Sequence, residues 1–342
     1  MAHELSIKSN GKAEMAYVGQ LPWHGLGQEV TEGASIGVWQ REAGMDWEAR
    51  SEVPNIETLD GNLIPFNDYK ALYRSDTLAP LAIVGTNYKV VQPREVLEFF
   101  RDLTESGGWH IHTAGVLRGG RKLWAMASNG EGANVLPARK AADRVTQNLL
   151  LATSLDGSMK TVAALTAIRV VCANTLALAL QGNGEKVQVS HRTVFDPAVI
   201  KRALGLSQES FAAFMNSARE MAETPIQLDE SLAVLRGIFG SPENKQPPSN
   251  AWMGRLADLG NQPIIPADEK ESRSVSRILE LFDGAGKGSA LPGAKGTRWG
   301  LFNAVTEHVD HEMGRSTDTR LDSAWFGRGN GFKQQAFSAL TA

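Results

Sequence analysis

The sequence predicts an α+β protein with an antiparallel β-sheet core, in which hairpins fill roughly residues 109–168 and helices flank the sheet, followed by a helix-rich C-terminal half. Three observations lead to this fold class. Short apolar segments separated by tight turns fill the core, segments with helical spacing follow residue 196, and the two kinds do not alternate. Such an order indicates α+β rather than α/β. We therefore expect a sheet-rich core over residues 1–192 and a helical region over residues 193–342 that packs on the core or extends it.

The elements before the core are short. A glycine-rich, irregular lead-in is followed by a short helix from Trp39 that ends at Gly44. A longer helix begins at Pro93 and ends at Gly107, because proline suits the first helical turn and the apolar residues that follow form one stripe. Strands are expected between these two helices, near residues 47–53, 70–74 and 81–84.

The core should contain two consecutive antiparallel hairpins. Their turns are Arg118-Gly-Gly-Arg121 and Asp156-Gly157. The four strands are expected at residues 109–117, 121–128, 145–154 and 159–168.

Helices are expected after the core. Residues 171–180 should be helical and end near Gly182. Five further helices are expected at residues 198–204, 208–223, 229–239, 272–282 and 297–313. Segments rich in glycine and proline near residues 241–250 and 284–296 are expected to be mobile.

Several classes of protein are disfavoured by the sequence. The longest apolar stretch is interrupted by Arg169, so we expect no transmembrane span and no membrane partner. The N-terminus lacks the apolar segment of a signal peptide, which predicts a cytoplasmic location. Cys172 is the only cysteine, which excludes an internal disulfide, and its apolar neighbours favour a buried, inert thiol. No catalytic motif stands out, so the sequence favours a non-enzymatic role without a resident cofactor and leaves catalysis open.

Positive charge is concentrated in the middle of the chain. The net charge is −3, but residues 84–192 carry 13 Lys and Arg against 8 Asp and Glu, and this third alone is net positive. Cations beside aromatic rings are typical of sequence-tolerant binding to single-stranded nucleic acid. The candidate nucleic-acid-binding residues are Arg118, Arg121, Lys122, Arg144, Lys160 and Arg169, with Trp109 and Trp124.

A competing interpretation of these residues stays open. Strand alternation places Lys122 and Trp124 on one face of their strand and Arg121 on the other, so both faces cannot contact DNA. Trp124 is then a core residue, and the cations are ordinary solvated side chains.

Two C-terminal motifs invite a chemical interpretation. His308 and His311 lie three positions apart on one helical face, which makes them weak candidates for a divalent metal, although zinc needs a third ligand and a polar helical face is favoured. Residues 284–289 resemble a scrambled phosphate loop, but the first glycine is missing and a flexible linker is favoured.

Six short motifs are spread over most of the chain, at residues 23–27, 85–92, 115–124, 168–176, 299–310 and 323–327. In combination they resemble a phage/plasmid-like protein family of unknown function that is found on phages, plasmids and integrated elements. The order of a helix, a meandering sheet and another helix is similar, at the level of the fold, to single-strand annealing proteins.

These observations favour a DNA-binding protein of a mobile genetic element. We expect it to bind or anneal single-stranded DNA in recombination or replication, as a homo-oligomer in which each subunit adds weak contacts. One alternative is a metal-dependent nuclease or other nucleic-acid enzyme. The other is a protein that interacts with a host factor.

Overall fold

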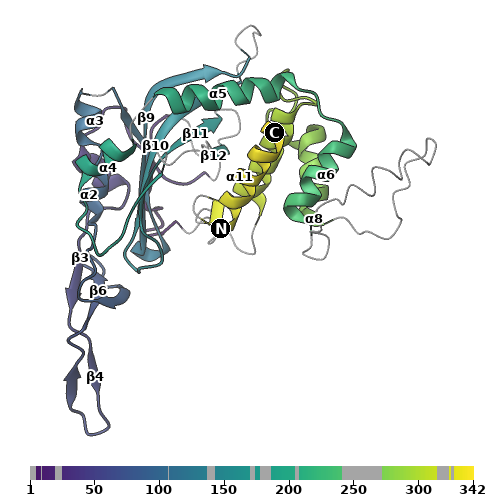
Figure 1. Cartoon of the computed structure of the whole chain (residues 1–342). Coiled ribbons are helices and arrows are strands. Elements are labelled where there is room, and N and C mark those ends of the chain that lie inside the picture. Colours follow the sequence, from purple (N-terminus) through teal and green to yellow (C-terminus); the bar gives the residue numbers. More distant parts are fainter. Residues whose placement is uncertain are drawn as a thin grey trace.

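The computed structural model describes residues 5–8, 10–19, 25–106, 108–136, 143–169, 174–177, 186–204, 208–240, 272–313, 323–324 and 327–342. Figure 1 shows a twisted sheet with short helices on one side, longer C-terminal helices on the other, and a narrow two-stranded projection that extends away from the body. The fold is α+β, as the sequence predicts.

An antiparallel meander forms the central sheet. It comprises β8 (His110–Leu117), β9 (Lys122–Asn134), β10 (Arg144–Ser154) and β11 (Thr161–Arg169). The four predicted strands are confirmed, but β9 pairs with both β8 and β10, so the two expected hairpins form one continuous sheet. Among the described residues, the strand order is β12-β11-β10-β9-β8-β1-β2, in which β12 is Asn174–Ala177, β1 is Met15–Tyr17 and β2 is Gln28–Glu29, and β13 (Lys186–Val189) also pairs with β11.

The N-terminal lead-in is more regular than the sequence indicates. It provides β1 (Met15–Tyr17), which pairs antiparallel with β8, and β2 (Gln28–Glu29), which is parallel to β1. Helix α1 (Ile36–Glu42) follows, and the chain adopts a positive φ of 71° at Gly44, where the sequence predicts the helix to end.

One predicted helix is divided in two. The structure has α2 (Pro93–Glu98) and α3 (Arg101–Ser106), and the side chains of Gln92 and Glu95 form a capping box at the start of α2. Phe99 and Phe100 lie between the helices, fully buried and edge to face at 5.0 Å between ring centroids. Adjacent residues of a straight helix point about 100° apart, so the chain bends where both rings enter the core.

The predicted helix over residues 171–180 is wrong within the described residues. Residues Asn174–Ala177 form strand β12 and pair antiparallel with β11, from Thr166↔Ala177 to Arg169↔Asn174. A short apolar run does not distinguish strand from helix by periodicity, and here the edge of β11 supplies the backbone partners.

A small second sheet extends from the body beside the turn between β8 and β9. It contains β3 (Ala49–Glu52), β6 (Tyr69–Arg74) and β7 (Pro80–Gly85), close to the predicted bounds. Between β3 and β6 the chain forms a further hairpin that the sequence analysis does not predict, made of β4 (Asn55–Glu57) and β5 (Leu63–Pro65). This hairpin is the projection in Figure 1.

Within the described residues, the five helices predicted for the C-terminal half are confirmed, and a further helix, α11 (Arg328–Thr341), is not predicted from the sequence. The predicted ones are α4 (Pro197–Leu204), α5 (Gln208–Glu223), α6 (Leu228–Phe239), α8 (Arg273–Glu280) and α9 (Arg298–Glu307). The π-helical turns Leu281–Ala285 and His308–Glu312 extend α8 and α9. Residues 241–250, expected to be mobile, lie outside the described residues, as does Cys172. None of the helices in the described ranges has the length and hydropathy needed to cross a bilayer.

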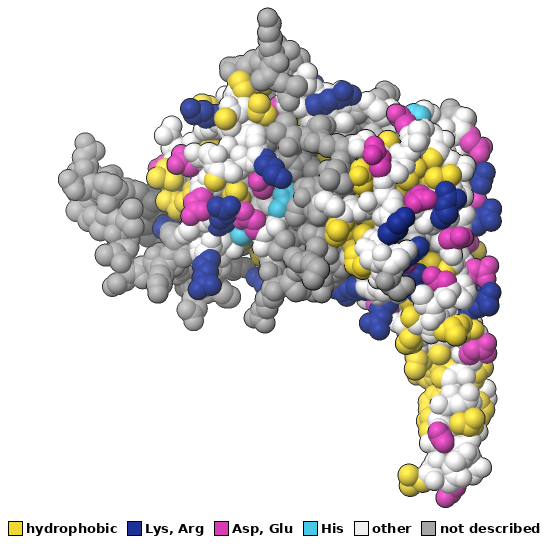
Figure 2. Space-filling model, turned by 180° about the vertical axis from the view of Figure 1, so that it is seen from behind, with side chains coloured by type: hydrophobic (Ala, Val, Ile, Leu, Met, Phe, Trp, Pro, Cys, Tyr) yellow, Lys and Arg dark blue, Asp and Glu magenta, His cyan; other side chains and the backbone are white. Residues whose placement is uncertain are grey.

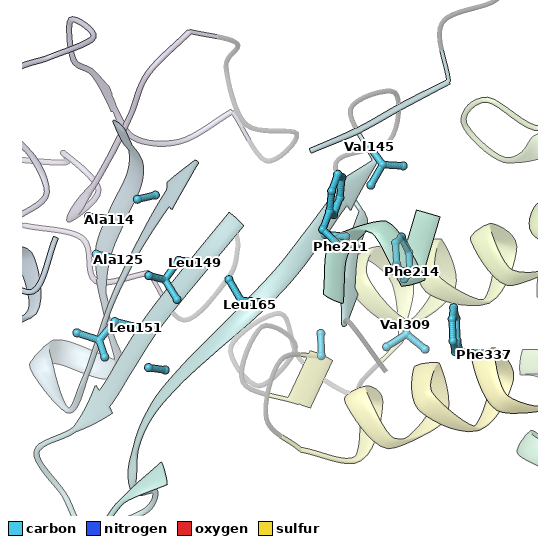
Figure 3. Packing of buried hydrophobic residues seen from close by; sticks show 14 of the residues in the cluster. Ala114, Ala125, Val145, Leu149, Leu151, Leu165, Phe211, Phe214, Val309 and Phe337 are labelled. Atoms are coloured by element: carbon cyan, nitrogen blue, oxygen red, sulfur yellow. The ribbon is translucent and has the colours of Figure 1, made fainter. Parts of the chain in front are cut away.

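The two halves of the chain share one hydrophobic core. Leu149 and Leu151 of the sheet and Phe214 and Phe337 of the helices belong to the same buried cluster (Figure 3). Buried Trp299 on α9 donates a hydrogen bond from Nε1 to Asp143 Oδ2 at 3.0 Å, next to the start of β10. This core packs one face of the sheet against helices and fixes the direction in which the hairpin turns point.

Candidate nucleic-acid interface

The turn between β8 and β9 presents two arginines at one end of the central sheet. Arg121 is exposed and Arg118 is half-buried. Two contacts hold the turn in place: the Gly119 N–H donates to Ser6 Oγ at 2.9 Å, and the Leu155 N–H donates to the Arg121 carbonyl at 2.7 Å. The turn is therefore fixed to the N-terminal segment on one side and to the β10–β11 turn on the other.

Three lysines lie on these two neighbouring segments. Lys160 is exposed on the β10–β11 turn, and Lys8 and Lys12 are exposed on a short N-terminal hairpin. The hairpin is closed by the Lys8 N–H, which donates to the Lys12 carbonyl at 2.9 Å. We call the following residues the basic turn end: Lys8, Lys12, Arg118, Arg121 and Lys160.

Lys8 and Lys12 are not among the residues predicted from the sequence, although a signal for them exists. They flank Asn10-Gly11, a strong turn dipeptide, and Gly11 has a φ of 79° in the structure. The turn can be found from the sequence. Its position beside the β8–β9 turn depends on a pairing between Leu5 and Leu117, which are more than a hundred residues apart.

A buried ion pair supports the turn from below. Arg74 donates to both carboxylate oxygens of Glu14, at 2.7 and 2.9 Å, and also to Asp76, and its guanidinium lies over the Trp47 ring. Burial alone would lower the pKa of Arg74, but the hydrogen bonds to Asp76 and Glu14 raise it overall. A Cβ at Gly120 would lie 3.1 Å from the Arg74 side chain, so the turn packs directly on this pair. Two carboxylates outnumber the single guanidinium, so this cluster adds no positive charge, and the positive charge of this end comes from the exposed lysines and arginines of the turns.

Three of the expected DNA contacts are buried in the structure. Lys122 and Trp124 lie side by side on the second face of the sheet, which points away from the main core. Trp124 packs there in a small cluster with Met15 and Met126. Trp109 belongs to the main core. Neither indole ring has an open face on which a base could stack, because side chains of the protein surround both.

The remaining two candidates lie at the opposite end of the meander. Arg144 begins β10, and it is exposed, with one guanidinium N–H donated to the Gly130 carbonyl at 3.1 Å. Arg169 ends β11 and pairs in register with Val145. A strand of the length of β10, which spans 11 residues, separates its two ends by about 33 Å. The structure therefore divides the expected cations between two ends of the sheet and gathers only Arg118, Arg121 and Lys160.

A polar cluster occupies the second face of the sheet near that opposite end. His112 Nε2 donates to Asn148 Oδ1 at 2.9 Å, and Asn148 Nδ2 donates to the Thr146 carbonyl at 3.0 Å. Loss of water around the ring lowers the pKa of His112 to about 4, and the hydrogen bond that the ring donates to Asn148 only partly opposes this. His112 is therefore neutral at pH 7 and adds no positive charge to the sheet.

The metal candidates do not come together as a site. His308 uses both ring nitrogens within the protein, one with Glu312 and one with Ser274, each at 3.1 Å. His311 is half-buried one turn further on. Within the described ranges, no group of three or more His, Cys, Asp or Glu side chains is arranged to hold a metal ion.

The glycine-rich loop at residues 284–289 binds a carboxylate of its own chain. The Lys287 N–H donates to Glu307 Oε2 at 2.9 Å, and Ser289 Oγ donates to the Gly286 carbonyl at 2.7 Å. The loop follows a helix and a π-helical turn rather than a strand. In a phosphate loop, backbone N–H groups bind the phosphate, whereas here the Lys287 N–H already donates to Glu307.

These features define a class: an α+β protein with an antiparallel meander that gathers exposed cations at one turn end. The chain belongs to the family described as Domain of unknown function (DUF932), whose model matches residues 80–325. The match extends from β7 through the meander to the C-terminal helices, and the β4–β5 hairpin lies outside it. Among curated proteins and among solved structures, nothing matches this chain.

Proposed function

We propose that the chain binds DNA through its basic turn end, as a cytoplasmic DNA-binding protein of a mobile genetic element. One observation carries the proposal: five cations, distant in sequence, gather on three adjacent turns and hairpins, and four of them are exposed. Such a cluster can neutralise successive phosphates. The resemblance of the sequence motifs to a phage/plasmid-like family supports the setting on a mobile element.

The position of the cations favours single-stranded DNA. They lie on three separate turns and hairpins rather than along one straight element, and a flexible single strand can follow them. A duplex is stiff over about 150 base pairs and contacts only cations that match its backbone. Because the two candidate indoles are buried, the contacts would be mainly to phosphates, and binding would be independent of sequence and sensitive to salt.

Strand annealing or protection in recombination or replication is the process that we propose for this binding. A surface with few cations binds weakly on its own. Several copies along one strand would add their contacts, so a homo-oligomer fits this role. The similarity in element order to single-strand annealing proteins supports the same process as a fold-level analogy.

The test is a fluorescence-anisotropy titration of labelled single- and double-stranded DNA at two salt concentrations, with and without magnesium. The variant Lys12→Ala/Arg121→Ala/Lys160→Ala removes three exposed cations of the basic turn end. The matched control Arg144→Ala/Arg202→Ala/Arg273→Ala removes three exposed cations elsewhere, and so changes the net charge equally.

We expect salt-sensitive binding by the wild type and the control. The turn-end variant should bind at least tenfold more weakly, and the slope of log affinity against log salt should fall by about 2, since each single-strand phosphate contact adds about 0.7. Wild-type affinity in that variant would refute the site. Magnesium-dependent cleavage would instead support a nuclease, and no binding to either DNA would favour a host-factor partner.

A further inference from the structure

The β4–β5 hairpin projects from the protein without contributing to its core. We call residues 53–69 the arm. Its two strands pair only with each other, in the register Ile56↔Ile64, and form a separate two-stranded sheet. Every residue of the arm is exposed except Pro54 and Thr58, which are half-buried. The arm has its own internal order, because the Phe66 N–H donates to the Pro54 carbonyl at 2.8 Å and the tip is closed by hydrogen bonds at Thr58.

The arm exposes large apolar side chains. Ile56 and Ile64 are directly opposite each other, and alternation places Phe66 on the same face, with exposed fractions of 49%, 52% and 43%. Leu63 is 66% exposed, and Leu59 at the tip is fully exposed. A solitary hairpin is marginally stable in water, and monomeric proteins rarely expose a continuous apolar surface of this kind. The arm therefore has the character of a binding element.

The charges of the arm indicate the kind of surface that it binds. Residues 51–69 contain no lysine or arginine, and the acidic residues in or beside the arm are Glu52, Glu57, Asp60 and Asp68. In the view of Figure 2, the arm carries hydrophobic and acidic side chains toward its tip and no basic ones. Such a surface repels DNA. Its complement is a basic surface with exposed apolar side chains.

The basic turn end of this same protein has both properties. Its five cations lie close to two exposed apolar side chains, Ile7 at 53% and Leu78 at 72%. Ile7 belongs to the N-terminal hairpin that carries Lys8. Leu78 lies in the turn whose first residue, Arg74, is bound by Glu14 of the same N-terminal segment. Leu78 and Ile7 thus lie on segments that adjoin the turns carrying the cations.

We propose that the arm of one copy docks on the basic turn end of a second copy of this chain. The arm extends away from its own body (Figure 1), so the acceptor belongs to another copy. Its carboxylates then face Lys8, Lys12, Arg121 and Lys160, and its apolar face covers Ile7 and Leu78. The two contacting surfaces differ, so the contact is head to tail and repeats into a ring or a filament.

This contact also regulates the DNA site, a consequence that rests on the proposed function. The arm and a DNA strand would use the same cations. Single-stranded DNA should therefore displace the arm, and an arm with reversed charges should leave the DNA site open.

Sedimentation velocity of the full chain over a range of concentrations, at low and high salt, tests the contact. Glu57→Lys/Asp60→Lys reverses charges on the arm, and Arg121→Glu/Lys160→Glu reverses charges on the acceptor. Glu32→Lys/Glu223→Lys is the control for the arm variant, because it makes the same charge change at two exposed positions away from both surfaces. Far-UV circular dichroism checks the fold of each variant.

We expect the wild type and the control to associate at low salt and to dissociate as salt rises. Each reversed variant alone should associate at least tenfold more weakly. An equimolar mixture of the two reversed variants should recover the association, since each arm again meets an acceptor of opposite charge. A wild type that stays monomeric, or a mixture that stays dissociated, overturns the proposal.

The arm's apolar face provides a second test that does not depend on charge. Ile56→Ser/Ile64→Ser should weaken association at least tenfold, whereas Val194→Ser/Leu228→Ser, at exposed apolar positions elsewhere, should not. Equal effects of the two pairs would contradict docking by the arm. These measurements contain no DNA, so their failure is separate from a failure of DNA binding: association without DNA binding refutes only the proposed function, and DNA binding by a permanent monomer refutes only the arm contact.

Discussion

Replacement of His112 should flatten the acid side of the stability profile. The pKa of this histidine is about 4 in the folded protein, against an ordinary value of 6.5. Below pH 6.5 the unfolded chain binds a proton at this position and the folded chain does not, so acid favours unfolding. The stability due to neutral His112 is complete above pH 6.5 and is lost progressively as the pH falls toward 4.

The magnitude follows from the size of the shift. One pKa unit corresponds to about 1.4 kcal/mol, so the full shift is worth up to about 3 kcal/mol, and about 2 kcal/mol is lost by pH 5. His112→Gln keeps an amide that can donate to Asn148 but does not titrate. Urea unfolding at pH 7.5 and pH 5 measures both proteins, and other titrating groups cancel in the comparison. We expect the wild type to lose about 2 kcal/mol more than the variant, and parallel pH profiles would refute the reasoning.

Three further outcomes are expected. In urea unfolding, Asp310→Ala should lower the free energy of unfolding by about 3 to 5 kcal/mol, because it removes the carboxylate that lies 2.8 Å from Nζ of buried Lys333. The matched variant Lys333→Met/Asp310→Leu should recover much of that loss. Trp124→Ala should lower the free energy of unfolding by about 3 to 5 kcal/mol, because Trp124 lies in a buried cluster. Trp124→Phe, measured at a temperature where the variant is folded, should bind DNA as the wild type does. A selective loss of affinity for single-stranded DNA in Trp124→Phe would instead indicate stacking. Replacing residues 54–66 by a short glycine-serine loop should change the unfolding free energy of the monomer, measured by calorimetry, by less than about 1 kcal/mol, because none of these residues is fully buried. A large loss would show that the arm supports the core.

The sequence predicts the core strands and most helices because they carry their own local signals. The β8–β9 turn is defined by Arg118-Gly-Gly-Arg121, and three residues there adopt positive φ in the structure. Helix α5 has the predicted bounds, residues 208–223, since its apolar spacing is regular. Where local and tertiary preferences agree, the sequence alone suffices.

Elements that depend on distant partners are not predictable in this way. Strand β12 is a strand because the edge of β11 is available, and Phe99 and Phe100 bend their helix because both enter a core built from later segments. The arm is not predicted from the sequence, because its strands have only three residues each and show little periodicity. Pro54 and Asp60-Gly61-Asn62 beside them indicate only turns.

The candidate site shows the same division. Residue type identifies the cations, but only the sheet register reveals that Lys122 is buried, that Arg144 lies at the far end, and that Lys8 and Lys12 join Arg121. The site therefore depends on contacts across more than a hundred residues of chain, such as the one between Ser6 and Gly119.

Lysine footprinting tests most directly the claim that DNA binds at the basic turn end. The protein, diluted until it is monomeric so that no arm covers these lysines, is briefly acetylated with and without a single-stranded oligonucleotide, and the modified lysines are mapped by mass spectrometry. We expect the oligonucleotide to protect Lys12 and Lys160 and to leave exposed Lys295 equally reactive, with Lys122 unreactive in both samples because it is buried. Protection at Lys295 without protection at Lys12 and Lys160 would contradict the account and place DNA elsewhere on the protein.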